Sequence, residues 1–189
     1  MNSNQNSILK SVPNYLTMLR IALIPLIVMI YQIQPLHYRE FTTLIFFIAS
    51  ITDYLDGYMA RKYQLTSPFG KFFDPVADKL LVTVSLLILA VYYQNIWITL
   101  ASMIIISREI LMSSFREWIA SSSLQSNVSV SLIGKWKTTF QMLAIGGLFW
   151  EFNPFLNALS FLFLLLATIL TLYSLFLYFK EYGYSFKGV

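Results

Sequence analysis

The sequence contains no cysteine, only one histidine and few charged residues, which make up 12% of its 189 positions. Without cysteine the chain forms no disulfide and has no thiolate to serve as a nucleophile or a metal ligand. Soluble domains carry about 25% charged residues, so the charge is about half of the usual amount. Hydrophobic residues make up 57% of the chain. This composition indicates a membrane protein, and the length suits a single domain covering 1–189.

Six apolar stretches are candidates to cross a membrane as helices, since a hydrocarbon core about 30 Å thick takes about 20 residues, and the fifth is short and begins with two lysines. The six stretches are expected at residues 15–34, 41–61, 76–94, 96–119, 135–150 and 155–179. The predicted fold is therefore an all-α integral membrane protein, a bundle of six transmembrane helices. Residues 1–13 are expected to form a juxtamembrane segment that lies on the surface or is disordered, and they lack the basic leader and cleavage site of a signal peptide.

The distribution of positive charge predicts the orientation in the membrane. With six spans, and counting helix ends, only Arg39 of the 13 Lys and Arg residues lies on the side opposite to both termini. Positive residues favour the cytoplasmic side, so both termini are predicted to be cytoplasmic. The net charge of +4 does not indicate nucleic-acid binding, because the charges interrupt apolar runs and form no continuous stripe.

Acidic residues are concentrated between the second and third predicted spans. Four of the nine lie in this one window, at Asp53, Asp56, Asp74 and Asp78. The first two are three positions apart and the last two are four apart, so each pair shares a helix face. The order Asp74–Pro75 predicts an N-cap followed by the first residue of a helix. A turn containing Pro68 and Gly70 is then expected to join the two helices.

Four ionised carboxylates that face one another repel, by about 4 kcal/mol for a pair about 4 Å apart at an effective dielectric constant near 20. A divalent cation would offset this repulsion. Oxygen ligands without a nearby His or Cys favour Mg²⁺ or Mn²⁺, and a pair of such ions is suited to phosphoryl transfer. In one alternative the aspartates only cap helices and pair with neighbouring Lys and Arg. In another they form the ion site of a divalent-cation transporter, although such proteins more often show paired repeats.

Residues 53–78 read D-x2-D-G-x2-A-R-x8-G-x3-D-x3-D, which resembles the signature of the CDP-alcohol phosphatidyltransferase family at all eight fixed positions. The resemblance implies a six-helix membrane bundle, usually a homodimer, that transfers a group from a CDP-linked substrate to a hydroxyl acceptor and releases CMP. It implies that the four aspartates bind two divalent ions, Mg²⁺ or Mn²⁺, and that Asp78 is the general base. The residues implied to line the CDP-diacylglycerol site are Gly57, Ala60, Arg61, Gly70 and Thr17.

Residues 13–21, 108–120 and 128–142 resemble bacterial members of the family that use sn-glycerol 3-phosphate as acceptor. They imply an enzyme of the bacterial cytoplasmic membrane, in contact with membrane lipids, whose active site faces the cytoplasm. In the first of these segments Arg20 lies near the site, or else its side chain reaches to the membrane surface.

An acceptor that bears a phosphate requires a cationic pocket. The candidates flank one cytoplasmic loop and are Arg108, Arg116, Lys135 and Lys137. Arg108 and Arg116 are eight positions apart, close to two helical turns, so they are expected to share a face. Glu109 and Glu117 are expected to pair with neighbouring arginines. These cations could instead contact lipid headgroups. Within the family, the alternative is a cardiolipin synthase whose acceptor is phosphatidylglycerol, but a pocket rich in Arg and Lys favours the smaller phosphorylated acceptor.

Overall fold

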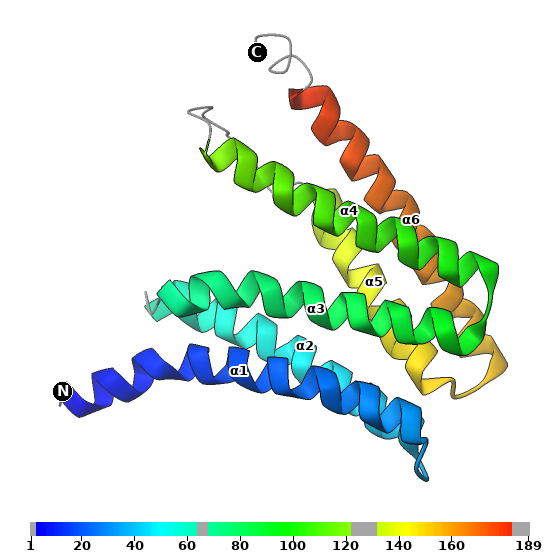
Figure 1. Cartoon of the computed structure of the whole chain (residues 1–189), viewed down its shortest axis with the longest axis horizontal. Coiled ribbons are helices and arrows are strands. Elements are labelled where there is room, and N and C mark those ends of the chain that lie inside the picture. The colour runs from blue at the N-terminus through cyan, green and yellow to red at the C-terminus, as the bar shows by residue number, and fades with distance from the viewer. Residues whose placement is uncertain (1–2, 64–67, 122–131, 183–189) are drawn as a thin grey trace. The chain divides into compact units, whose positions relative to one another are not determined.

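The computed structural model describes residues 3–63, 68–121 and 132–182 of the chain. The described residues form six α-helices and no strand (Figure 1). The helices are α1 (Ser3–Ile33), α2 (Tyr38–Tyr63), α3 (Pro68–Tyr93), α4 (Ile96–Ser121), α5 (Leu132–Trp150) and α6 (Pro154–Tyr182). The all-helical fold that the sequence predicts is confirmed for this part of the chain.

Four of these helices contain a stretch that is long and apolar enough to cross a membrane. The stretches are Tyr15–Ile33 of α1, Phe72–Tyr93 of α3, Ile96–Ile119 of α4 and Pro154–Lys180 of α6. Among the described residues α2 and α5 do not reach this level, because α2 carries several charged residues and α5, only 19 residues long, begins close to two lysines. The protein is therefore a multi-pass membrane protein, and the count of six spans stays a prediction.

The start of α3 differs from the prediction. The helix begins at Pro68, so Asp74 is not an N-cap and Pro75 lies inside the helix. A proline at the first helical position loses nothing, because that N–H has no partner within the helix. Pro68 is as well suited to the first helical position as Pro75. Because Pro75 removes only one hydrogen bond inside the helix, the helix can begin at Pro68 and continue through Pro75. Pro68 and Gly70 consequently lie in the first turn of α3, and the connection 64–67 lies outside the described residues.

The N-terminal segment also differs from the prediction. Helix α1 begins at Ser3, so the described part of residues 1–13 is helix and continues into the first apolar stretch. Of the two alternatives, a surface-lying or a disordered segment, the helix contradicts disorder, and the surface-lying alternative stays a prediction. Once the apolar part of α1 is helical, each further residue adds a backbone hydrogen bond without a new nucleation cost, so the helix extends into polar sequence.

Residues Met1–Ile88 and Phe149–Glu151 form a first compact unit, which contains α1, α2 and most of α3. Helix α1 packs along α2 in this unit, as Figure 1 shows. Its aromatic side chains meet at Phe149, whose ring lies 5.3 Å from that of Tyr31 and 5.9 Å from that of Phe46, measured between centroids. All three side chains are buried, so they form part of the core that holds α1 against α2.

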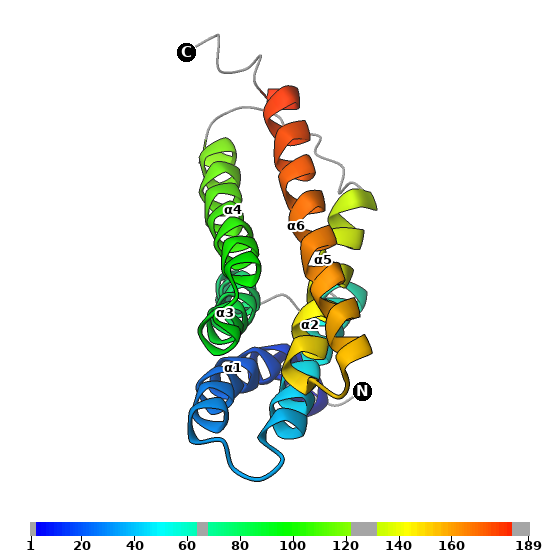
Figure 2. The ribbon, with the colours of Figure 1, turned by 90° about the vertical axis from the view of Figure 1, so that its right-hand side faces the viewer.

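Residues Leu89–Leu148 and Phe152–Val189 form a second unit, which contains the end of α3, α4, most of α5 and α6. Helices α4 and α6 run side by side in it (Figure 2). Helix α5 approaches α6 closely at Gly147, where an added Cβ atom would lie 2.0 Å from the Oγ atom of Ser160. Glycine is therefore required at this contact, because the buried Ser160 hydroxyl is itself bound to the Leu156 carbonyl oxygen.

Candidate active site

The aspartates of the motif belong to the first unit. Asp53 lies on α2, and Asp74 and Asp78 lie one turn apart on α3. All three side chains are half-buried. The side chain of Asp56, also on α2, lies outside the described residues. Two helices thus supply the acids, as the spacing in the sequence predicts.

A buried arginine on α1 binds the first of these aspartates. The Nη1 atom of Arg20 donates a hydrogen bond to the Oδ1 atom of Asp53 at 2.6 Å. The Arg20 side chain has no exposed surface, whereas that of Asp53 is 39% exposed. Arg20 therefore does not reach to the membrane surface. An arginine in the middle of a membrane helix costs about 2.5–3.5 kcal/mol on insertion scales, and the pairing with Asp53 offsets part of that cost.

A threonine one turn before Arg20 binds an aspartate from the other helix. The Oγ1 atom of Thr17 donates to the Oδ1 atom of Asp74 at 2.5 Å, and Thr17 is fully buried. Residues three positions apart lie on the same helix face, so Thr17 and Arg20 present adjacent side chains. Helix α1 thereby holds one aspartate of α2 and one of α3 at neighbouring positions. Each carboxylate accepts a short hydrogen bond, from the Thr17 hydroxyl or from the Arg20 guanidinium, and this bond fixes its orientation.

The donor atoms of this site fit a hard divalent ion. Carboxylate oxygens are the ligands that Mg²⁺ and Mn²⁺ prefer. A carboxylate has two oxygens, so Asp74 can accept the Thr17 hydrogen bond and still bind an ion through the second oxygen. Among the described side chains, which do not include that of Asp56, no three His, Asp or Glu residues lie close enough together to hold an ion. The predicted four-aspartate cluster is therefore not tested.

The other residues predicted around the CDP-diacylglycerol site are only partly described. Gly57, Ala60 and Arg61 lie in the last turns of α2, and their side chains are outside the described residues. Gly70 is buried in the first turn of α3. The fifth, Thr17, is the buried partner of Asp74 described above.

In the second unit, two buried cations meet at one glutamate. Arg108 on α4 is 9% exposed and Lys137 on α5 is 5% exposed. Lys137 donates a hydrogen bond to the Oε1 atom of Glu109, and the Nη1 atom of Arg108 lies 3.5 Å from the same oxygen. The Nη2 atom of Arg108 donates to the Oγ atom of Ser174 on α6 at 2.9 Å. Side chains from α4, α5 and α6 thus form one polar cluster.

The structure brings together two of the four predicted acceptor-site cations. Arg116 lies on α4 but is exposed, whereas Arg108 is buried. Eight residues turn a helix by about 80° beyond two full turns, which explains why the two arginines, predicted to share a face, differ in their surroundings. The side chain of Lys135 lies outside the described residues.

Sequence reasoning gave little weight to two members of this second cluster. Glu109 was expected only to pair with an arginine, but it contacts Lys137 as well. A glutamate inside an apolar helix is itself a signal, because charged residues at membrane depth are costly and usually functional. Ser174 has no comparable signal, since serine is common in membrane helices.

Comparison with known proteins agrees with the motif. A sequence model of the CDP-alcohol phosphatidyltransferase family matches residues 10–176. The CDP-diacylglycerol–glycerol-3-phosphate 3-phosphatidyltransferase of Haemophilus influenzae is 46% identical over 169 residues, which cover 89% of this chain and 91% of that protein. Proteins of the same name from Pectobacterium atrosepticum and Yersinia enterocolitica are 42% and 41% identical over 168 residues, which cover 89% of this chain and 92% of each relative. The resemblance inferred from the eight-position signature is confirmed.

Proposed function

Because this chain belongs to the CDP-alcohol phosphatidyltransferase family, we propose that it transfers the phosphatidyl group of CDP-diacylglycerol to sn-glycerol 3-phosphate. The products are phosphatidylglycerophosphate and CMP. The observation that carries the proposal is the pair of contacts by which Thr17 and Arg20 of α1 hold Asp74 and Asp53. It supports a site at which aspartates of the family signature act together, and the names of the relatives support the choice of acceptor.

The reaction exchanges one phosphorus–oxygen bond for another. A hydroxyl oxygen of glycerol 3-phosphate forms a bond to the phosphorus of the phosphatidyl group. The bond between that phosphorus and the bridging oxygen breaks, and CMP leaves with the electron pair. The hydroxyl proton goes to the carboxylate of Asp78. This residue lies one turn after Asp74 and is half-buried, so it belongs to the same helix face as a motif aspartate and remains within reach of solvent-borne substrate.

Members of this family generally use divalent metal ions. We propose two ions of Mg²⁺ or Mn²⁺. The residues that would hold them are Asp53, Asp56, Asp74 and Asp78. Bound there, the ions would orient and neutralise the diphosphate of CDP-diacylglycerol. The protein's own part is to orient the ligands, through Arg20 for Asp53 and through Thr17 for Asp74.

The diphosphate needs close access to the backbone and a positive partner. Gly57, Ala60 and Gly70 have small side chains that would let it approach helices α2 and α3. Arg61 would supply a charge-assisted hydrogen bond to a phosphate oxygen. Thr17 completes the proposed CDP-diacylglycerol site, and its contact with Asp74 indicates that it acts there by orienting that aspartate.

The acceptor's phosphate is assigned to the cations of the second unit. Arg108 and Lys137 are both buried and lie against one carboxylate oxygen. In surroundings of low dielectric constant an arginine and a lysine attract a phosphate more strongly than they do in water. Arg116 and Lys135 are the further candidates for this pocket. Glu109 balances only one of the two positive charges of Arg108 and Lys137, so the cluster favours an acceptor that carries negative charge.

The assay that tests the proposal follows CMP release by the purified protein in detergent. CDP-diacylglycerol and Mg²⁺ are supplied with one acceptor at a time: sn-glycerol 3-phosphate, phosphatidylglycerol or glycerol. We expect CMP release with sn-glycerol 3-phosphate, together with a product of the mass of phosphatidylglycerophosphate. Release with phosphatidylglycerol instead would favour a cardiolipin synthase. An absence of release with every acceptor would refute the transferase assignment.

We further propose that the chain is a single catalytic domain with six spans in the bacterial cytoplasmic membrane, with both termini and the active site on the cytoplasmic side. The family match supports one domain, since residues 10–176 include helices of both units. Because the sequence has no cysteine, a thiol reagent labels only a cysteine that is introduced, and its labelling shows on which side of the membrane that position lies. Leu36→Cys, at an 83% exposed site between α1 and α2, should react with an impermeant maleimide from outside the cell, and Ser121→Cys should not. The reverse labelling would contradict this orientation.

The family resemblance implies a homodimer, which we adopt as part of the proposal. Light scattering of the purified protein, corrected for bound detergent, should give a protein mass of twice 21.9 kDa. A mass equal to that of one chain would contradict it.

A further inference from the structure

We propose that Glu109 is the positioning residue of the acceptor site, which keeps Arg108 and Lys137 together as a two-cation unit before the acceptor's phosphate arrives. The inference rests on the proposed function, since it takes sn-glycerol 3-phosphate as the acceptor. It concerns a residue that does not itself bind the phosphate. Glu109 acts through the two cations that it contacts.

The first support is geometric. Arg108 comes from α4 and Lys137 from α5, and both contact the Oε1 atom of Glu109. Two buried like charges repel when nothing lies between them. The attraction of both cations to one shared carboxylate oxygen offsets that repulsion, so the cations stay close together although they belong to different helices.

The second support is the way in which Arg108 is oriented. The Oγ atom of Ser174 accepts a hydrogen bond from Arg108 Nη2 and donates one to the Thr171 carbonyl oxygen at 2.9 Å. Ser174 and Glu109 therefore hold the two ends of one guanidinium group. A guanidinium has five N–H donors in a fixed plane, so fixing its two ends fixes the direction of the remaining donors.

The third support is an unused donor. The Nε atom of Arg108 is buried and has no hydrogen-bond partner among the residues that the structure describes. A buried donor without a partner is costly, and most such groups in proteins are satisfied. A phosphate oxygen would satisfy it. One glutamate against two cations also leaves one positive charge, which an anionic ligand would balance.

The expected consequence concerns binding of the acceptor rather than chemistry. Without Glu109 the two cations are free to separate, and the acceptor must then bring them together as it binds. That cost appears in the affinity, as it does whenever a preorganised site is loosened. The turnover number should change little, because the role proposed for the two cations is to bind the acceptor's own phosphate and not the phosphorus that reacts.

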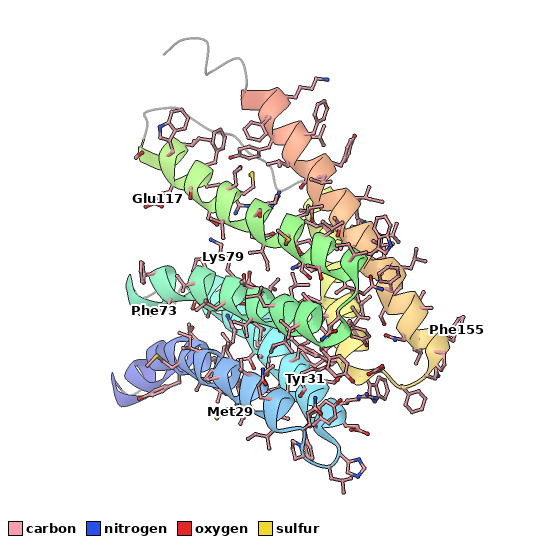
Figure 3. The ribbon with its side chains drawn as sticks, turned by 45° about the vertical axis from the view of Figure 1, so that its right-hand side comes forward. Met29, Tyr31, Phe73, Lys79, Glu117 and Phe155 are labelled. Atoms are coloured by element: carbon pink, nitrogen blue, oxygen red, sulfur yellow. The ribbon has the colours of Figure 1, made fainter. Side chains whose placement is uncertain are left out.

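The experiment compares Glu109→Gln with Glu117→Gln. Glu117 lies two turns later on the same helix and is exposed, and Figure 3 shows it near the end of α4. Glu109→Gln keeps the size of the side chain but removes its charge. We expect it to raise the KM for sn-glycerol 3-phosphate about tenfold or more, with the kcat and the KM for CDP-diacylglycerol within about twofold of wild type. Glu117→Gln should match wild type, and Glu109→Asp, which keeps the charge, should recover part of the affinity.

A direct binding measurement gives the second readout. The rise in the thermal unfolding temperature caused by sn-glycerol 3-phosphate alone, measured in detergent, should be smaller for Glu109→Gln than for Glu117→Gln. A lower KM for the acceptor in Glu109→Gln would overturn the inference, since the glutamate would then compete with the phosphate. An equal rise in the KM values for sn-glycerol 3-phosphate and CDP-diacylglycerol would also overturn the inference, because it would indicate that Glu109 has a structural role. If Glu109→Gln does not fold, Glu109→Ala, which also removes the charge, undergoes the same measurements, and wild-type values throughout in that variant would overturn the inference.

The wild-type assay separates this inference from the function that it assumes. Wild-type protein that releases no CMP with sn-glycerol 3-phosphate would refute the proposed function, whatever the variants do. Wild-type protein that is active with this acceptor, beside a Glu109→Gln variant with an unchanged acceptor KM, would refute the inference alone.

Discussion

In the first unit the buried Arg20 pairs with Asp53 of the family motif, whereas in the second Glu109 contacts two buried cations. The charges in the two arrangements have opposite signs. In the first the acids come from α2 and α3, and the counter-charge comes from α1. In the second the cations come from α4 and α5, and the counter-charge is the residue next to Arg108 on α4.

The difference indicates what each unit binds. Buried charges of one sign are stable only when a partner or a ligand balances them. At the first site several motif aspartates lie near one another in the chain, which favours a bound cation, and at the second cluster two cations contact one glutamate, which favours a bound anion. Arg20 pairs with Asp53, and Glu109 contacts both Arg108 and Lys137 but balances only one of their two charges. Changes in the first unit should therefore alter the metal requirement, and changes in the second should alter the acceptor requirement.

Removal of the proposed metal ions should have the largest effect, because the motif carboxylates would then have no bound cation to orient the diphosphate. We expect activity to fall to background in EDTA and to return with Mg²⁺ or Mn²⁺. Asp74→Asn should lower activity just as far at any metal concentration. Full activity in the presence of chelator would contradict the assignment of the first unit to metal binding.

Asp78→Asn should have the next largest effect. The asparagine keeps the shape and one ligand oxygen but accepts no proton from the acceptor hydroxyl. A general base contributes about 10²–10⁴-fold, so kcat should fall by that factor while CDP-diacylglycerol still binds. A kcat close to that of wild type would eliminate the role as base. Loss of metal binding in the variant would favour a role for Asp78 as a metal ligand alone.

Arg20→Gln should have an intermediate effect, because it removes the counter-charge of the first unit but leaves every motif aspartate in place. Residues that orient metal ligands contribute about 10- to 100-fold to metal affinity or activity. We expect the concentration of Mg²⁺ needed for half-maximal activity to rise within that range. Arg39→Gln is the matched control, since Arg39 pairs with Glu151 at 2.9 Å, away from the motif. Equal effects of the two variants would argue that Arg20 only supports folding.

The smallest effect is expected from Arg116→Gln in the second unit. Arg116 is exposed, and salt screens exposed charges, so the acceptor KM should rise only a few-fold and mainly at low ionic strength. Lys137→Gln, which changes a buried cation of the same unit, should raise it by about tenfold or more at any ionic strength. Initial rates at two salt concentrations distinguish the two variants. A larger rise of the acceptor KM in Arg116→Gln than in Lys137→Gln would mean that the acceptor binds at the surface.

Much of the fold follows from local signals in the sequence. The start of α4 at Ile96 was predicted, and its cause is Asn95, whose side-chain oxygen accepts a hydrogen bond from the backbone N–H of Trp97 at 2.9 Å. Asn153 caps α6 in the same way, at Leu156. The start of α3 was missed, because Pro68 and Pro75 both satisfy the preference for proline in a first turn.

The site is less predictable, because its contacts join residues far apart in the chain. The aspartates were found by their spacing, which the helix period makes informative. Thr17 and Arg20 were placed near the site by the family resemblance alone, and their pairing was not predicted, since Arg20 and Asp53 are 33 positions apart and Thr17 and Asp74 are 57 apart. Glu109 and Lys137 are 28 apart on different helices. Local periodicity does not determine which face of one apolar helix packs on another, so tertiary structure was needed to pair these groups.

The most direct test of the two-unit account is to measure the Mg²⁺ requirement and the sn-glycerol 3-phosphate KM for both Arg20→Gln and Lys137→Gln, by CMP release under the same conditions. The account predicts crossed results. Arg20→Gln should raise the Mg²⁺ requirement with little change in the acceptor KM, and Lys137→Gln should raise the acceptor KM with little change in the Mg²⁺ requirement. Two variants that alter both quantities in the same proportion would contradict the division of metal and acceptor binding between the two charge clusters.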